Sequence, residues 1–211
     1  MKKSGIFAVL LAATAVVAPA TPAGAATCTV APTQAVVSDE PHQVTFTVSG
    51  AKDWKLQSVS AGSISAGLQL KVTDEAPVRV FDREDFRNRD AGQHTVRVTR
   101  DGSRCNATFR VLRDSIIGVD AYQEGTGRLV YGRLYRVSLN PQDLVWGPVA
   151  QQKITIQYKA LSTGKWVSAG TATTDAAGKF QLLKKKIGKR TWRAVYAGTS
   201  TTVKASETTV G

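Results

Sequence analysis

VAQQKITIQYKALSTGKWVSAGTATTDAAGKFQLLKKKIGKRTWRAVYAG, residues 149–198, is the stretch that decides the fold. In its first run, 153–159, every second side chain is apolar, and successive side chains of a β-strand point to opposite faces. Similar runs follow at 166–173, 180–182 and 192–196, separated by turns that contain glycine. The pattern predicts an antiparallel β-sandwich. Its core is expected to contain Ile154, Ile156, Tyr158, Phe180, Leu182, Trp192, Ala194 and Tyr196.

The order of motifs in this half of the chain carries a resemblance. Trp146-Gly147-Pro148 is followed by KITIQYK, by GKWVSAGTATTDAAGKF and by TWRAVYAG. In this order, residues 114–211 resemble the bacterial immunoglobulin-like (Ig-like) repeat of secreted actinobacterial proteins. TTDAAGKF also resembles hairpins of carboxypeptidase-regulatory-like and Cna-B-like sandwiches. The resemblance implies an Ig-like fold, and it implies no particular activity because such sandwiches carry many unrelated functions.

The preceding half of the chain shows the same strand pattern less regularly. Alternating runs occur at 43–48, 68–72, 94–100 and 105–113, with a hairpin turn near 101–103. We therefore predict an all-β protein with two consecutive Ig-like antiparallel β-sandwich domains, 27–113 and 114–211, after a cleaved signal peptide. No linker rich in proline, glycine or serine separates the halves, so we expect the two domains to touch.

The N-terminus has the features of an export signal. Two lysines precede the apolar segment 6–17, and Ala23-Gly24-Ala25 forms a cleavage site of small residues. The apolar segment is shorter than the roughly 20 residues of a membrane-spanning helix. Residues 1–25 are thus predicted to be removed, which makes the protein secreted and extracellular, with no integral membrane span after processing. An uncleaved anchor and a lipoprotein modified at Cys28 remain alternatives, although Thr27 stands where a lipobox has glycine or alanine.

The chain contains two cysteines, Cys28 and Cys105. Exported proteins mature in an oxidising compartment, where paired thiols form disulfides. We therefore predict one intramolecular disulfide, which closes a loop of 77 residues. It joins the beginning of the first domain to one of its last strands.

Positive charge is concentrated in the second half. The chain has a net charge of +12. Residues 114–211 contain 14 basic and 6 acidic side chains, whereas 27–113 contain 12 and 10. The densest group, here called the basic cluster, comprises Lys184, Lys185, Lys186, Lys189 and Arg190. It predicts weak association with an extracellular polyanion such as teichoic acid. A purely solubilising turn is the alternative. Nucleic acid is not expected, because export and the absence of a nucleic-acid-binding motif argue against it.

The position of the basic cluster follows from strand parity. Lys184 and Lys186 share their parity with Leu182, which is expected to face the core. The two lysines must therefore lie beyond the edge of the core, or a bulge must change the register.

The sequence contains no strong motif for catalysis or metal binding. The acidic segment 82–90 lacks the spacing of a calcium loop and contains three arginines, so we expect an exposed, self-neutralised loop. His42 and His94 are expected at the surface or rim, without a metal or catalytic motif around them. Trp146 is the one aromatic residue predicted for a binding surface. The sequence therefore predicts no catalytic residue, no metal ligand and no cofactor.

Three classes of function follow. The favoured class is a secreted, non-catalytic Ig-like protein with a binding or cell-envelope role and a cell-wall polyanion or extracellular protein as partner. The second is a secreted inhibitor or effector that acts through a loop on a protein partner. The third is an enzyme whose catalytic residues have no recognisable motif.

Overall fold

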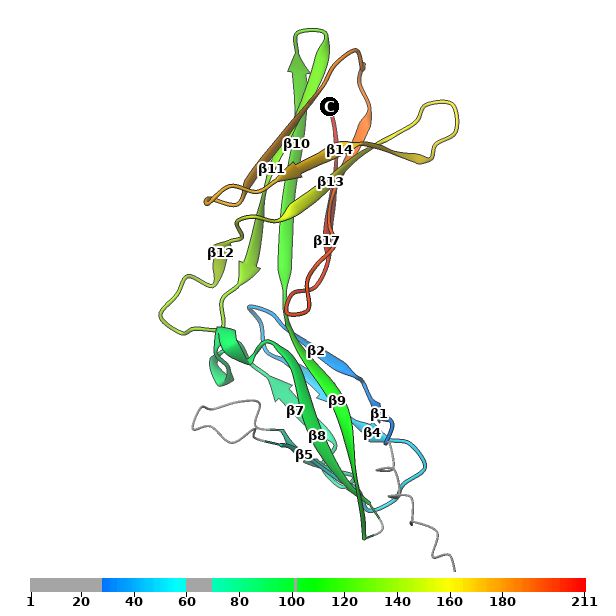
Figure 1. The fold of residues 1–211 in the computed structure, drawn as a ribbon, viewed down its shortest axis with the longest axis vertical. Coiled ribbons are helices and arrows are strands. Elements are labelled where there is room, and N and C mark those ends of the chain that lie inside the picture. The colour runs from blue at the N-terminus through cyan, green and yellow to red at the C-terminus, as the bar shows by residue number, and fades with distance from the viewer. Residues whose placement is uncertain (1–27, 60–69, 101) are drawn as a thin grey trace, which may run out of the picture.

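A computed structural model describes residues 28–59, 70–100 and 102–211, and the predicted signal peptide at 1–25 lies outside the described residues. The described chain folds into two Ig-like antiparallel β-sandwiches arranged end to end (Figure 1). The all-β prediction is confirmed, since the described residues form strands and two short 3-10 helices, η1 (Arg83–Asp85) and η2 (Asn88–Asp90).

The N-terminal sandwich has one large sheet and one layer of short strand pairs. The large sheet has the order β2-β9-β8-β5-β6, and in it β2 runs parallel to β9. The facing layer pairs β1 with β4 and β3 with β7. The strands are β1 (Val30–Ala31), β2 (Gln34–Val37), β3 (His42–Thr45), β4 (Thr47–Val48), β5 (Lys55–Ser58), β6 (Lys71–Thr73), β7 (Val78–Phe81), β8 (Gly92–Arg100) and β9 (Ser103–Arg113).

A hydrogen bond between the start of β8 and the turn before it supports the Ig-like assignment. Many Ig-like domains have a tyrosine near the start of a late strand whose hydroxyl bonds to the backbone a few residues upstream. In this chain, His94 lies at such a position. Its ring Nε2 donates to the backbone carbonyl of Asp90 at 2.8 Å. Two residues later, Val96 points into a core that contains Phe46, Phe81 and Phe109.

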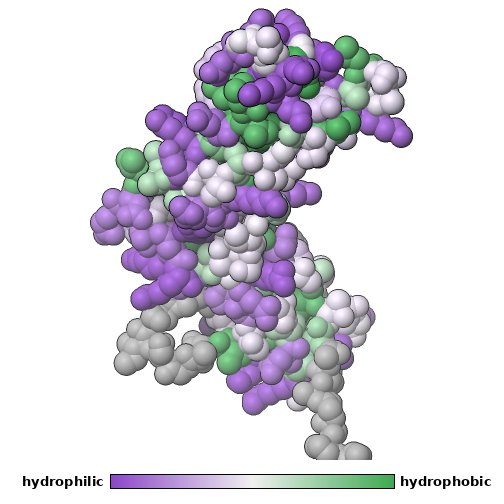
Figure 2. Space-filling model, turned by 45° about the horizontal axis from the view of Figure 1, so that its top comes forward, coloured by the Kyte–Doolittle hydropathy of each residue, from purple (hydrophilic) through white to green (hydrophobic). Residues whose placement is uncertain are grey.

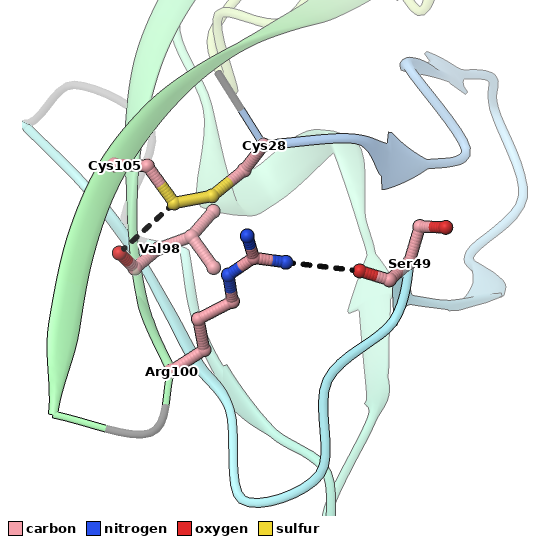
Figure 3. The surroundings of a disulfide bond; sticks show 5 residues. All are labelled: Cys28, Ser49, Val98, Arg100 and Cys105. Carbon is pink, nitrogen blue, oxygen red and sulfur yellow. Dashed lines mark hydrogen bonds between the residues drawn. A yellow bond between two sulfur atoms is a disulfide. The ribbon is translucent and has the colours of Figure 1, made fainter. Parts of the chain in front are cut away.

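Cys28 and Cys105 form the predicted disulfide. Cys28 precedes β1, and Cys105 lies in β9, so the bond ties the start of the described chain to the last strand of the first sandwich (Figure 3). Close to it, the guanidinium of Arg100 donates to the carbonyl of Ser49 at 3.1 Å. The disulfide therefore connects the two layers of the sandwich at one end.

The C-terminal sandwich pairs two sheets of four strands each. One has the order β14-β13-β16-β17, and the other joins β10, β11 and β15, with β12 paired to the end of β11. The strands are β10 (Ser115–Glu124), β11 (Gly127–Val137), β12 (Trp146–Pro148), β13 (Lys153–Lys159), β14 (Trp166–Thr173), β15 (Lys179–Lys184), β16 (Thr191–Tyr196) and β17 (Ala205–Val210).

The predicted core of this sandwich is confirmed. All the expected residues except Tyr158 and Leu182 are buried, and these two are partly buried against the same cluster. The alternation of apolar and polar residues was sufficient to predict this core, because the face to which a strand residue points depends only on its position along the strand. The register in β13 shifts between Ile156 and Gln157, and Gly170 on β14 absorbs the irregularity with a φ of 150°.

The two sandwiches meet through backbone hydrogen bonds. Only Asp114 separates β9 from β10, and its amide donates to the carbonyl of Val37 at 2.9 Å. The backbone of Arg113 pairs with the 199–203 turn, donating to Thr201 at 3.0 Å and accepting from Val203 at 3.0 Å. The 199–203 turn of the second sandwich is thereby held against the end of β9, and the connection at Asp114 is held against the end of β2.

The acidic segment 82–90 departs from expectation. It pairs charges in part, since Arg79 and Asp85 form an ion pair at 2.7 Å. However, Phe86 and Asp90 are buried, and the carboxylate of Asp90 accepts from the amide of Arg87 at 2.7 Å. The side-chain oxygen of Asn88 accepts from the amide of Leu139 at 2.9 Å. The prediction of an exposed loop is therefore only partly correct: Glu84, Asp85, Arg87 and Arg89 are exposed, whereas Phe86 and Asp90 are buried. The hydrogen bond of Asn88 to Leu139 makes the segment part of the junction between the sandwiches.

Candidate functional site

The basic cluster lies at the end of the C-terminal sandwich remote from the junction (Figure 1). β15 ends at Lys184, and Lys185 and Lys186 form the turn that follows. The φ of Lys186 is 54°, a left-handed conformation that ends the strand alternation. The strand thus stops at Lys184, which is consistent with lysines placed beyond the edge of the core.

Pairing with distant segments enlarges this basic end. Lys184 is the register partner of Arg128 on β11, so a further cation joins the cluster. Arg190 and Gly211 exchange backbone hydrogen bonds of 2.8 and 3.0 Å, which hold the turn against the end of β17. No sequence pattern links Arg128 to the basic cluster, because its proximity depends on the pairing of β11 with β15.

Three cations of the cluster are open to solvent, and no member of the cluster forms an ion pair within the described part of the chain. Lys185, Lys186 and Lys189 are exposed, while Lys184 and Arg190 are half-buried. The ammonium of Lys184 donates to the carbonyl of Ala169 at 3.4 Å. Across 28–59, 70–100 and 102–211, the Arg79–Asp85 pair is the one ion pair, and it lies in the other sandwich. Figure 2 shows hydrophilic side chains mixed with apolar ones over this end. The arrangement favours a diffuse positive field over a shaped pocket.

A second polar surface lies on the outer face of β13 and β16. The guanidinium of Arg193 donates to Oε1 of Gln157 through Nε at 3.0 Å and Nη2 at 2.6 Å. It also lies over the ring of Trp166, 4.2 Å from its centroid. These contacts fix the cation in one orientation. Beside it is an open hollow of about 490 Å³, which Lys204 and Ser206 also line.

The opposite sheet exposes aromatic side chains. Tyr122 and Tyr131 meet edge to face, with centroids 5.6 Å apart. The Tyr131 hydroxyl donates to the carboxylate of Asp120 at 3.1 Å, and this hydrogen bond raises the pKa of Tyr131. A hollow of about 570 Å³ lies alongside, where Gly118 presents no side chain. This face combines apolar rings with polar groups, and no motif in the sequence marks it.

The prediction for Trp146 is not supported by its location. Trp146 lies on β12 and is half-buried against the core of the N-terminal sandwich. Its indole Nε1 donates to the carboxylate of Asp39 at 3.3 Å. The residue therefore packs across the junction, because β12 lies against the first sandwich through pairing with the end of β11.

The histidines occupy separate places. His42 stacks on Phe81 with ring centroids 6.0 Å apart, and His94 forms the hydrogen bond with Asp90 at the start of β8. Among the residues that the structure describes, no group of three or more His, Cys, Asp or Glu side chains could hold a metal ion. In the same residues, no helix has the length and apolar character needed to cross a bilayer.

No protein-family model matches this chain, and no curated protein matches it. Several solved structures are remotely similar to this chain. Bovine butyrophilin has a TM-score of 0.40 at 12% identity, with 88% of this chain and 99% of that chain covered. For three N-terminal domains of the highly immunogenic outer capsid protein of bacteriophage RB49, the TM-score is 0.33 at 10% identity, covering 86% and 67%. The D00-D0 domains of intimin give 0.28 at 13%, covering 87% and 98%. Similarity at this level gives no information about function.

Proposed function

We propose that this protein is an extracellular, non-catalytic Ig-like binding protein whose basic cluster associates with anionic polymers of a cell envelope. The observation that carries the proposal is the accumulation of cations at the free end of the C-terminal sandwich, where none of them forms an ion pair with a described residue. The predicted signal peptide and the Cys28–Cys105 disulfide support export.

We also propose the following organisation. The mature chain has domains at 27–113 and 114–211, and the second belongs to the bacterial Ig-like repeats that it resembles. Hydrogen bonds at Arg113 and Asp114 support a junction of fixed geometry, with the basic cluster held at the end farthest from the N-terminal sandwich.

The proposed mode of binding is electrostatic and weak. Exposed lysines interact with phosphate or carboxylate groups through a field that is screened within about 8 Å at physiological salt. Because the cluster spans a turn and neighbouring strand ends, it suits repeated anionic groups along a polymer better than a single small ligand. Binding should therefore fall steeply as salt rises.

Replacement of Lys184, Lys185 and Lys186 by serine should weaken retention on immobilised teichoic acid or heparin. For a phosphate polymer, the slope of log affinity against log salt should fall by roughly 2, since each lost phosphate contact removes about 0.7–0.9. Retention across a salt gradient measures this slope. The unfolding midpoint should change little, because exposed charges contribute little to stability.

The matched control replaces Lys153, Lys159 and Lys165 by serine. These lysines are exposed in the same sandwich, and their loss changes the net charge by the same amount. The control should retain clearly more affinity than the cluster variant. Equal retention of the cluster variant and the parent protein, or equal losses in both variants, would contradict a localised site.

A specific observation favours a second candidate, the inhibitor or effector that acts through a loop. Leu161, at the tip of the protruding β13–β14 hairpin, is 77% exposed (Figure 1). An apolar side chain at a hairpin tip fits insertion into a pocket of a protein partner. Capture of one folded partner that survives high salt and is lost on Leu161→Asp would support this candidate in place of the polyanion.

A further inference from the structure

A hollow between the two sandwiches is lined by two arginines that are partly or fully buried. Its volume is about 370 Å³, and it is here called the junction hollow. Both sandwiches contribute to its wall, whose polar side chains are Asn88, Arg113, Arg136, Ser138 and Asp143. Arg113 is the last residue of β9, and Arg136 lies near the end of β11, so the junction brings two guanidiniums to one hollow.

Arg113 is deeply buried and incompletely paired. The residue is 6% exposed, and one of its terminal nitrogens donates to the side-chain oxygen of Asn88. Its Nε is buried without a hydrogen-bond partner. Buried polar groups normally find a partner, and an unpaired one costs about 1–3 kcal/mol. Arg113 also lines the junction hollow, so a ligand there would meet a guanidinium that has no ion-pair partner among the described residues.

The charge of Arg113 is only partly compensated. Burial, followed by the nearby charge of Arg136, lowers the pKa of Arg113 to about 10, while Tyr196 and Asp143 act in the opposite direction. The pKa of Arg136 is also lowered, again by burial. Both changes mean that the charged forms lack the solvation or counter-ions that they have in water.

The acidic residue of the hollow does not pair with either arginine. The carboxylate of Asp143 accepts from the hydroxyl of Ser138 at 2.6 Å and from the side-chain amide of Asn140 at 3.1 Å. These hydrogen bonds lower its pKa, so it stays ionised. Two guanidiniums and one carboxylate leave an excess of one positive charge. Arg136 has a single neutral partner, the hydroxyl of Thr202 at 3.3 Å.

We propose that the junction hollow binds a small oxyanion, such as phosphate, sulfate or a carboxylate group, through Arg113 and Arg136. A planar guanidinium presents parallel N–H donors that match the oxygen pairs of such anions. The ligand would neutralise the excess charge and accept hydrogen bonds from the two guanidiniums that line the hollow. Because residues from both sandwiches line the hollow, a bound anion would also stabilise the junction. This site is remote from the basic cluster and does not depend on it.

Inorganic phosphate is the probe for this site. When phosphate replaces chloride at constant ionic strength, the unfolding midpoint of the purified protein should rise with phosphate concentration, because the ligand binds only the folded state. Isothermal titration should detect the same binding. Arg136→Gln should weaken phosphate binding about tenfold or more, the factor expected for a lost hydrogen bond to a charged group.

Two further variants make the test specific. Arg133→Gln removes the same charge from the same strand outside the hollow, and it should keep the phosphate response of the parent. The Lys184, Lys185 and Lys186 to serine variant should also keep it, so the two proposals can fail independently. The oxyanion site is overturned if the parent shows no response to phosphate, or if Arg136→Gln keeps the full response. An equal loss of the phosphate response in Arg133→Gln would also overturn the proposal, since the response would then depend on the net charge of the protein and not on the hollow.

Discussion

Replacing Trp192 with alanine is expected to lower the free energy of unfolding by about 3–5 kcal/mol, the range for removing a large aromatic side chain from a core. Trp192 has no exposed surface and belongs to the core cluster of the C-terminal sandwich. Its ring packs against Tyr158, with centroids 5.7 Å apart. The loss combines lost burial of apolar surface with a cavity that the two sheets cannot close. Urea unfolding followed by circular dichroism measures it.

Trp166 provides the matched control for this prediction. It lies on β14, on the outer face of the same sheet, where its ring stacks with Arg193. Trp166→Ala should cost roughly 0.5–1 kcal/mol, the contribution of an exposed cation–π contact. Equal losses of unfolding free energy in Trp166→Ala and Trp192→Ala would mean that the inward and outward faces of this sheet are assigned incorrectly.

Removal of the Cys28–Cys105 disulfide is the second change with a large expected effect. The bond closes a loop of 77 residues, and loop-closure entropy in the unfolded chain corresponds to about 4 kcal/mol of stability. A Cys28→Ala/Cys105→Ala variant should lose about this amount in urea unfolding. The N-terminal sandwich should be the part affected, since both cysteines belong to it.

Reduction supplies an independent comparison. The parent protein with its disulfide reduced should unfold at nearly the same urea concentration as the double alanine variant. Labelling the denatured, unreduced protein with a thiol reagent should give no adduct. Two labelled thiols in the exported protein, or equal stabilities of the oxidised and reduced forms, would contradict the prediction.

The arginine pair shows what sequence reasoning could not reach. Arg113 and Arg136 are separated by a hairpin and lie in different sandwiches, and no local pattern distinguishes them from exposed strand arginines. Their proximity follows from the pairing of β10 with β11, which returns the chain to the junction. Asn88 likewise belongs to an acidic segment with the composition of a surface loop, yet it bonds to Leu139 across the junction.

The sequence by itself determined the properties that depend on neighbouring residues. Alternation with a period of two placed Ile154, Ile156 and Trp192 on the buried face, and the same parity required Lys186 to lie beyond the core edge or a bulge to change the register. The presence of only two cysteines left a single intramolecular pairing.

The tertiary structure alone decided which distant segments share a surface. It placed Arg128 beside Lys184, turned Trp146 toward Asp39 and gathered two guanidiniums in the junction hollow. The physical reason is that strand parity is set by local backbone geometry, whereas these neighbours depend on the strand order and the register of sheets. Those are selected by the packing of whole layers, to which each residue contributes only a small part of the free energy.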